Sequence, residues 1–144
     1  MRYGAAALAA LALGAGCGGS GGTTFPRFQR AANGICIRYA KVVNGLPAAK
    51  TMSGIAKSAR RTYSLGARER TELQQLAPPT DAQDDFRRLL AKLEQADELL
   101  PDVWHAASQG NQKQVRSLLG QGKAVTSQAN AKAAALGLDD CRRA

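Results

Sequence analysis

Apolar side chains recur every three or four residues in four separate stretches of this chain, and this spacing constrains the fold more than any other feature. The pattern is longest between residues 82 and 107, where steps of four and three alternate without a miss. Such steps place the apolar side chains on one face of a helix. The members of this longest series are Ala82, Phe86, Leu89, Leu93, Ala96, Leu100, Val103 and Ala107.

The other periodic stretches cover residues 24–46, 48–76 and 115–136, and proline, glycine or asparagine separates neighbouring stretches. The first carries its apolar face on Phe28, Ala32, Ile35, Tyr39, Val42 and Leu46. Four helices joined by short connections most simply form an antiparallel up-down-up-down bundle. The sequence therefore predicts an all-α four-helix bundle over residues 24–144.

Several residues predict where the helices begin, bend and end. Thr24 is the expected N-cap of the first helix, and residues 80–83 resemble a capping box for the third. Pro101 predicts a kink near residues 97–98, because proline removes a backbone donor from the helix interior. Gly137 suits the left-handed conformation that ends many helices, here the fourth.

The charge of the chain is strongly basic, with a formal net charge of +9 over 144 residues. Basic side chains dominate residues 25–76, whereas acidic ones dominate residues 81–102. A basic half can face anionic lipid headgroups or acidic wall polymers. The alternative is that these arginines lie on solvated helix faces without a specific partner.

The first 22 residues differ from the rest in composition. Arg2 precedes an apolar run at residues 4–15, which is typical of a signal peptide and too short to remain as a membrane span. The run ends in Leu-Gly-Ala-Gly-Cys at residues 13–17, which resembles the lipobox of bacterial lipoproteins, with Gly14 where the family usually has leucine. The resemblance implies a signal peptide at residues 1–16, export, acylation of Cys17 and anchoring to the outer face of the cell membrane. Residues 17–23 would form the lipidated cysteine and a flexible Gly/Ser tether. An ordinary secretory signal with a chance cysteine is the alternative.

The cysteine count also bears on export. There are three cysteines, and acylation of Cys17 would leave Cys36 and Cys141 as a pair. An oxidising compartment permits a disulfide between them. An antiparallel bundle brings the end of its last helix beside the start of its first, so this pairing is within reach. The alternative is two buried free thiols.

Three short stretches give the mature chain a further resemblance. They are residues 32–36, residues 76–79 and residues 134–141, which read ANGIC, LAPP and AALGLDDC. With them the chain resembles a loose group of small actinobacterial envelope lipoproteins and secreted proteins. The resemblance implies a helical domain that runs from cysteine to cysteine, and it implies no activity.

Few residues suggest catalysis. Asp102 and the single histidine, His105, form one D-x-x-H pair, whereas di-iron bundles use two E-x-x-H motifs and two further glutamates. The sequence contains no nucleophile elbow, zinc-protease helix, P-loop or haem-attachment motif. We therefore expect no enzymatic activity, no cofactor and no metal site, and we interpret the pair as a surface feature near a helix end.

Four residues are candidates for binding. Trp104 follows Pro101 and can line a groove or belong to the peripheral core, and His105 adjoins it. Arg60 and Arg61 belong to a basic run that can contact an anionic surface. An exported protein is a poor partner for nucleic acid, and the alternating aromatic and basic residues of single-strand binders are missing.

These observations favour a membrane-anchored envelope lipoprotein with a non-enzymatic binding or structural role. Its expected partners are the membrane, through the lipid anchor, and anionic lipid, a cell-wall polymer or another envelope protein. The alternative function is a ligand-binding helical module with a pocket near Pro101 and Trp104. A continuous apolar cavity of several hundred Å3 would favour that alternative.

Overall fold

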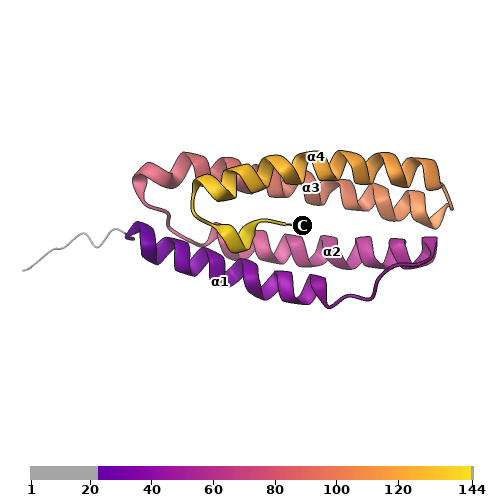
Figure 1. The fold of residues 1–144 in the computed structure, drawn as a ribbon, viewed down its shortest axis with the longest axis horizontal. Helices are drawn as coiled ribbons and strands as arrows, with labels where there is room; N and C mark the ends of the chain where they lie inside the picture. The colour runs from indigo at the N-terminus through magenta and orange to yellow at the C-terminus, as the bar shows by residue number, and fades with distance from the viewer. Residues whose placement is uncertain (1–22, 144) are drawn as a thin grey trace, which may run out of the picture.

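The computed structural model describes residues 23–143, so Cys17, the predicted leader and most of the predicted tether lie outside the described residues. The described chain forms four α-helices, α1 (Phe25–Asn44), α2 (Met52–Gln74), α3 (Gln83–Ser108) and α4 (Gln112–Ala135). Two short 3-10 helices, η1 (Thr80–Ala82) and η2 (Asp139–Cys141), precede α3 and follow α4. The helices run alternately in opposite directions (Figure 1), which confirms the predicted all-α up-down-up-down bundle.

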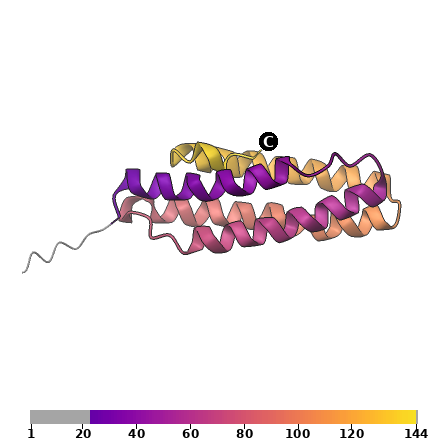
Figure 2. The ribbon, with the colours of Figure 1, turned by 90° about the horizontal axis from the view of Figure 1, so that it is seen from below.

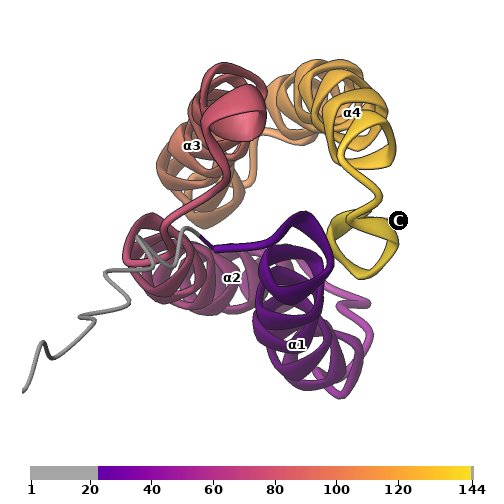
Figure 3. The ribbon, with the colours of Figure 1, turned by 90° about the vertical axis from the view of Figure 1, so that its left-hand side faces the viewer.

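The helices pack in chain order, α1 on α2, α2 on α3 and α3 on α4, while η2 packs against α1. Seen along the bundle axis, η2 lies between α1 and α4 (Figure 3). The segment after α4 therefore provides the contact that closes the bundle. No sequence pattern indicated that a helix after Gly137 would do this.

The helix α1 is the shortest of the four, at 20 residues against 26 for α3. At a rise of about 1.5 Å per residue, α1 is about 9 Å shorter than α3. Figure 2 shows that α1 ends before the far end of the bundle, where the chain continues without helix to the start of α2. One side of the bundle is therefore covered over only part of its length.

The apolar interior divides into two clusters along the bundle. The first lies where α1 and η2 pack, and within it the rings of Phe28 and Phe86 meet edge to face with centroids 4.9 Å apart. The second cluster lies toward the other end, between α2, α3 and α4. Its buried members are Ala59, Val103, Ala106, Ala107, Val115 and Leu118.

The helix ends differ in part from the expectations. Thr24 is the N-cap residue of α1, but its side chain forms no capping hydrogen bond. The predicted capping box at residues 80–83 is wrong, because η1 occupies residues 80–82 and α3 begins at Gln83 without a side-chain cap. Pro101 lies inside α3, which continues through it to Ser108 as the apolar spacing predicted, and the kink near residues 97–98 stays a prediction.

The end of α4 matches its prediction. Gly137 has a φ of +64°, and the amides of Gly137 and Leu138 donate to the carbonyls of Ala134 and Ala133 at 3.0 and 2.9 Å. This is the Schellman arrangement, and the buried Leu138 supplies the apolar contact that accompanies it. It turns the chain back toward α1.

Two apolar positions of the predicted first helix are wrong, since Leu46 lies beyond α1, which ends at Asn44, and Val42 does not face the core. Val42 is 44% exposed instead of facing the core. It lies in the last turns of α1, a helix that packs mainly on α2 and η2, and neither of these covers the Val42 side chain. Gly34 lies within α1 and does not interrupt it, although glycine in a helix interior is unfavourable.

Candidate functional site

A groove of about 750 Å3 runs between the helices on the side that α1 covers incompletely. On α4 its walls extend from Leu118 to Asn130, which is about 18 Å along the helix axis. Its apolar part lies toward the second cluster, and its polar part lies beside the C-terminal tail. The apolar part is lined by Ala96, Leu99, Leu100, Val103, Leu118, Leu119 and Gly122.

The polar part of the groove contains a buried ion-pair cluster. The guanidinium of Arg143 donates to Oδ1 of Asp97 and to Oε2 of Glu69, both at 2.8 Å. Arg70 donates to the other oxygen of Asp97 at 3.0 Å. The side chain of Asp97 is only 1% exposed, and Glu69 is also buried. The cluster joins α2, α3 and the C-terminal tail, and it balances two carboxylates with two guanidinium groups.

A glycine makes room for this cluster. Gly66 of α2 faces Asp97 of α3, and a Cβ atom built on Gly66 would collide with the Asp97 carboxylate. Glycine is the only residue without a Cβ. The approach of α2 to α3 at this level therefore depends on Gly66.

The surroundings shift the ionisation of the cluster. Burial raises the pKa of Asp97 and of Glu69 above their ordinary values, although Arg143 opposes the shift in both cases. Burial alone would lower the pKa of Arg143, but its two carboxylate partners outweigh that effect and raise it. Arg143 thus stays charged, and each carboxylate binds a proton more readily than it would in water.

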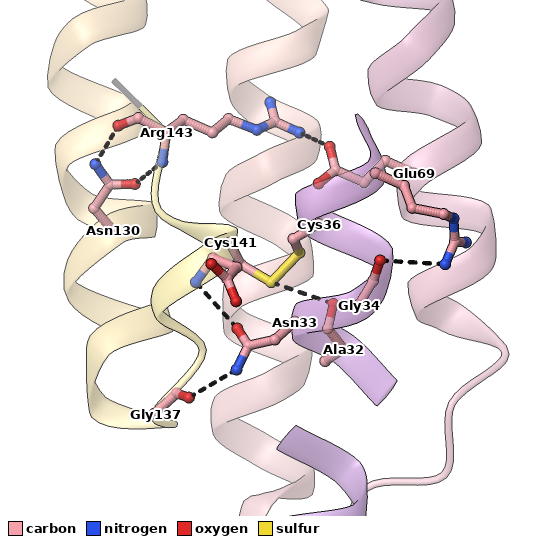
Figure 4. The surroundings of a disulfide bond; sticks show 11 residues. Ala32, Asn33, Gly34, Cys36, Glu69, Asn130, Gly137, Cys141 and Arg143 are labelled. Atoms are coloured by element: carbon pink, nitrogen blue, oxygen red, sulfur yellow. Dashed lines mark hydrogen bonds and ion pairs between the residues drawn. A yellow bond between two sulfur atoms is a disulfide. The ribbon is translucent and has the colours of Figure 1, made fainter. Parts of the chain in front are cut away.

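The disulfide between Cys36 and Cys141 positions this arginine. The two Cα atoms are 4.9 Å apart, both residues are buried, and the bridge confirms the predicted pairing (Figure 4). Asn33 donates to the carbonyl of Gly137 at 3.2 Å and accepts from the amide of Asp140 at 3.1 Å. The tail that follows α4 is therefore fixed to α1 by a covalent bond and by hydrogen bonds.

A second residue holds the very end of the described tail. The side chain of Asn130 accepts from the amide of Arg143 at 2.8 Å and donates to its carbonyl at 2.7 Å (Figure 4). These two bonds fix the backbone of Arg143 against α4. The arginine side chain can then cross the groove to Glu69 and Asp97.

The residues singled out from the sequence lie apart from this cluster. Trp104 and Arg60 line a separate open hollow of about 530 Å3 between the start of α2 and the end of α3. The guanidinium carbon of Arg60 lies 5.9 Å from the centroid of the Trp104 ring, a cation–π contact. His105 is exposed beside Trp104, with ring centroids 5.1 Å apart, and Arg61 is exposed outside the hollow.

The pocket expected near Pro101 and Trp104 thus corresponds to two cavities. Leu100 and Val103, which flank Pro101 in the sequence, line the large groove, while Trp104 lines the open hollow. Trp104 is also packed against the second cluster. It therefore both lines a cavity and belongs to the periphery of the core. Asp102, the partner of His105 in the D-x-x-H pair, is exposed.

Sequence reasoning missed Asp97, Glu69 and Arg143. One signal was available for Asp97, which lies four residues after Leu93 and eight after Leu89. Both leucines are fully buried, so the carboxylate occupies a position on the apolar face of α3. A charged residue at such a position is almost never fully buried without a partner. Neither Glu69 nor Arg143 carries an equivalent signal.

Residues 23–143 contain no group of three or more His, Cys, Asp or Glu side chains placed to hold a metal ion. Within the same residues, no helix combines the length and apolar character that crossing a bilayer requires. Comparison with known proteins adds no relative: no protein-family model, no curated protein and no solved structure matches the chain.

Proposed function

We propose that this chain is an exported envelope lipoprotein, acylated on Cys17, whose helical bundle binds a small, largely apolar ligand in the interhelical groove without catalysing a reaction. The groove is the observation that carries the binding part of this proposal. The lipobox-like residues 13–17 carry the anchoring part.

The groove has the size and character of ligand sites in helical proteins. Such sites enclose about 300–1,000 Å3, are mostly apolar and often lie between the helices of bundles. The volume of about 750 Å3 falls in this range. Leucine and valine side chains line one part, and the cluster around Asp97 provides polar groups in the other.

The state of the buried carboxylates supports a binding role over a catalytic one. Asp97 and Glu69 already accept hydrogen bonds from Arg143, and Asp97 also accepts one from Arg70. A carboxylate that acts as a general base must reach the proton of a substrate. Both groups here are engaged in holding the tail.

Two features support export and anchoring. The Cys36–Cys141 disulfide suits an oxidising compartment, which exported proteins reach. The glycine and serine residues at 18–22 form a composition typical of flexible linkers. A diacyl or triacyl cysteine would hold the domain at the membrane more firmly than one acyl chain, since each buried CH2 adds about 0.8 kcal/mol.

Anchoring is tested by growing cells that express the chain with a clickable palmitate analogue. We expect label on the wild type and a membrane-bound protein whose mass indicates an acylated N-terminal cysteine. Cys17→Ala should lose both the label and the membrane association. An unlabelled wild-type protein would overturn the anchoring part of the proposal.

Ligand binding is tested with the neutral fluorescent probe N-phenyl-1-naphthylamine. We expect its emission to rise on the wild-type domain and not on Gly122→Phe, because Gly122 lines the groove and a large ring there would fill it. Gly120→Phe is the matched control, since Gly120 is exposed on the same helix with open space around it. Equal emission from both variants would contradict binding in the groove.

A further inference from the structure

A second cavity, the open hollow between α2 and α3, lies outside the groove and has a different chemistry. Its volume is about 530 Å3. Residues from the first turns of α2 form one wall, and residues from the last turns of α3 form the other. The lining residues are Met52, Ser53, Ala56, Lys57, Arg60, Trp104, Ala107, Ser108 and Gly110.

The charged side chains that line this hollow are all positive. Lys57 and Arg60 are exposed, and neither forms an ion pair among residues 23–143. They follow Ser53 at intervals of four and three residues, so all three lie on one face of α2. The hollow therefore offers two free cations and a hydroxyl along one wall.

The start of α2 adds to the positive character of the hollow. The amides at the start of α2, at Met52 and Ser53, have no partner within the helix, and this end carries a partial positive charge. The opposing end of α3 is closed by a turn, in which the amides of Gly110 and Asn111 donate to the carbonyls of Ala107 and Ala106. This end of α3 carries a partial negative charge, and these two of its carbonyl groups are already hydrogen-bonded.

An aromatic ring completes the hollow. Trp104 packs on the second apolar cluster, and Tyr63 meets its ring at 73° with centroids 6.3 Å apart. Arg60 is held over the same ring. The indole and the guanidinium are therefore positioned together before any ligand arrives, which reduces the entropy lost on binding.

From these features we propose that the open hollow binds an acidic glycan, one segment of a carbohydrate polymer that carries carboxylate or phosphate groups. The planar guanidinium of Arg60 can pair with such a group through two hydrogen bonds, and Lys57 adds a second charge. Trp104 supplies an apolar surface for the face of a sugar ring, and Ser53 and Ser108 supply hydroxyl partners. An open hollow admits a chain that continues on both sides.

The position of the hollow favours a polymer over the surface of the bilayer. The described chain begins at the end of the bundle where α1 starts, whereas α2 begins and α3 ends at the opposite end (Figure 1). An anchor at Cys17 would therefore join the bundle at the end away from the hollow. The preference for a polymer over the bilayer surface is the one part of this inference that rests on the proposed anchoring.

The test uses the fluorescence of Trp104, which is the single tryptophan of the chain. The wild-type domain is titrated with polygalacturonate, a carboxylated glycan, at low ionic strength. We expect a saturable change in the emission that weakens as salt is added, because the contacting charges are exposed and salt screens them. N-phenyl-1-naphthylamine should remain bound in the groove throughout this titration. A loss of glycan binding is thereby distinguished from a loss of ligand binding in the groove.

Adjacent arginines provide a matched pair of variants. Arg60→Ala should weaken binding at least tenfold, while Arg61→Ala, which removes the same charge outside the hollow, should change it less than threefold. Lys57→Ala should also weaken binding. Trp104→Leu can disturb the packing beneath the ring, so its circular dichroism and groove binding are measured first. A folded variant should lose binding of the glycan, measured by isothermal titration calorimetry on this variant and on the wild type because the variant has no tryptophan.

Four results would overturn the proposal. They are the absence of any emission change with polygalacturonate, equal weakening by Arg60→Ala and Arg61→Ala, equally tight binding of polyglutamate or neutral dextran, and binding of phosphatidylglycerol vesicles without binding of the glycan. The polyglutamate result would indicate charge attraction alone. The vesicle result would assign the hollow to the membrane surface.

Discussion

Gly66 on α2 lies so close to the carboxylate of Asp97 on α3 that a Cβ atom at residue 66 would overlap it. The glycine is buried, and so is the acid. This contact brings together a residue that weakens a helix and a residue that is costly to bury. The carboxylate of Asp97 can be buried here because Arg143 and Arg70 donate hydrogen bonds to its two oxygens.

The Gly66 contact predicts an unusual response to alanine. Gly66→Ala should lower the free energy of unfolding by about 1–3 kcal/mol, because overpacking at Asp97 exceeds the gain in helix propensity. Gly34→Ala is the control, since a Cβ there meets nothing within 4 Å. It should stabilise the protein by up to about 1 kcal/mol. Urea unfolding of both variants measures the difference, and similar stabilities would refute the close contact.

Arg143 forms part of the buried cluster and its neighbour Arg142 does not, so alanine should lower the stability far more at residue 143 than at residue 142. Arg143→Ala should cost about 3 kcal/mol, because removing one partner leaves buried charge without compensation. Arg142→Ala should cost less than about 0.5 kcal/mol, since Arg142 is exposed and its ion pair within residues 23–143 is with the exposed Asp139. Chemical unfolding curves of the two variants test this. Comparable losses would mean that the tail, and not the ion pair, supplies the stability.

The disulfide predicts a large effect of reduction. It closes a loop of 105 residues in sequence separation, and in the chain-entropy model a loop of this size is worth about 4.7 kcal/mol. In a Cys17→Ala background, Cys36→Ser/Cys141→Ser should unfold at much lower denaturant than the oxidised protein. Reductant should lower the stability of the parent to the same level and leave the double variant unchanged. If reductant has no effect on the folded parent, its cysteines are not bridged.

The buried carboxylates predict the sign of one pH effect. Burial raises the pKa of Asp97, so just above pH 3.8 the folded state keeps a proton that the unfolded chain releases. In that window, raising the pH lowers the free energy of unfolding by up to about 1.4 kcal/mol per pH unit. The stability that the protonated group provides is therefore present at low pH and lost as the pH passes the raised pKa.

Comparison of variants isolates this contribution. Asp97→Asn should gain stability relative to the wild type as the pH rises through the window, whatever its stability at any one pH. Asp84→Asn removes an exposed carboxylate from the same helix and should keep the pH profile of the wild type. Unfolding free energies at a series of pH values provide the test. Parallel profiles for Asp97→Asn and the wild type would show that the pKa of Asp97 is not raised.

Predictions from the sequence succeeded where neighbouring residues decide the outcome. Apolar spacing fixes which face of a helix can be buried, so Leu89, Leu93 and Val103 are all in the core. Gly137 ends α4 as expected because a left-handed residue favours glycine. The prediction of a capping box failed because residues 80–82 form η1. The capping pattern does not distinguish a 3-10 turn from the first turn of an α-helix at these residues.

Positions that depend on a distant segment were harder to predict. Val42 continues the apolar spacing of its helix, yet it is exposed because α1 packs mainly on α2 and η2, which do not cover this side chain. Trp104 was recognised as a candidate, but only the structure brings Arg60 to its ring. Cys17 and its acylation lie outside the described residues and stay a prediction.

The amino-acid sequence by itself determined the four helices, because the periodicity of apolar residues is local. It also predicted their alternating order and the pairing of Cys36 with Cys141, the latter from the cysteine count together with the expected bundle topology. The tertiary structure decided that η2 fills the space between α1 and α4, and that Arg143 crosses to Asp97 and Glu69. The physical reason is that burying a charge is costly unless it is paired, and the partners of this buried cluster come from distant parts of the chain. Those partners lie 46 and 74 residues away from Arg143, beyond the range of any local pattern.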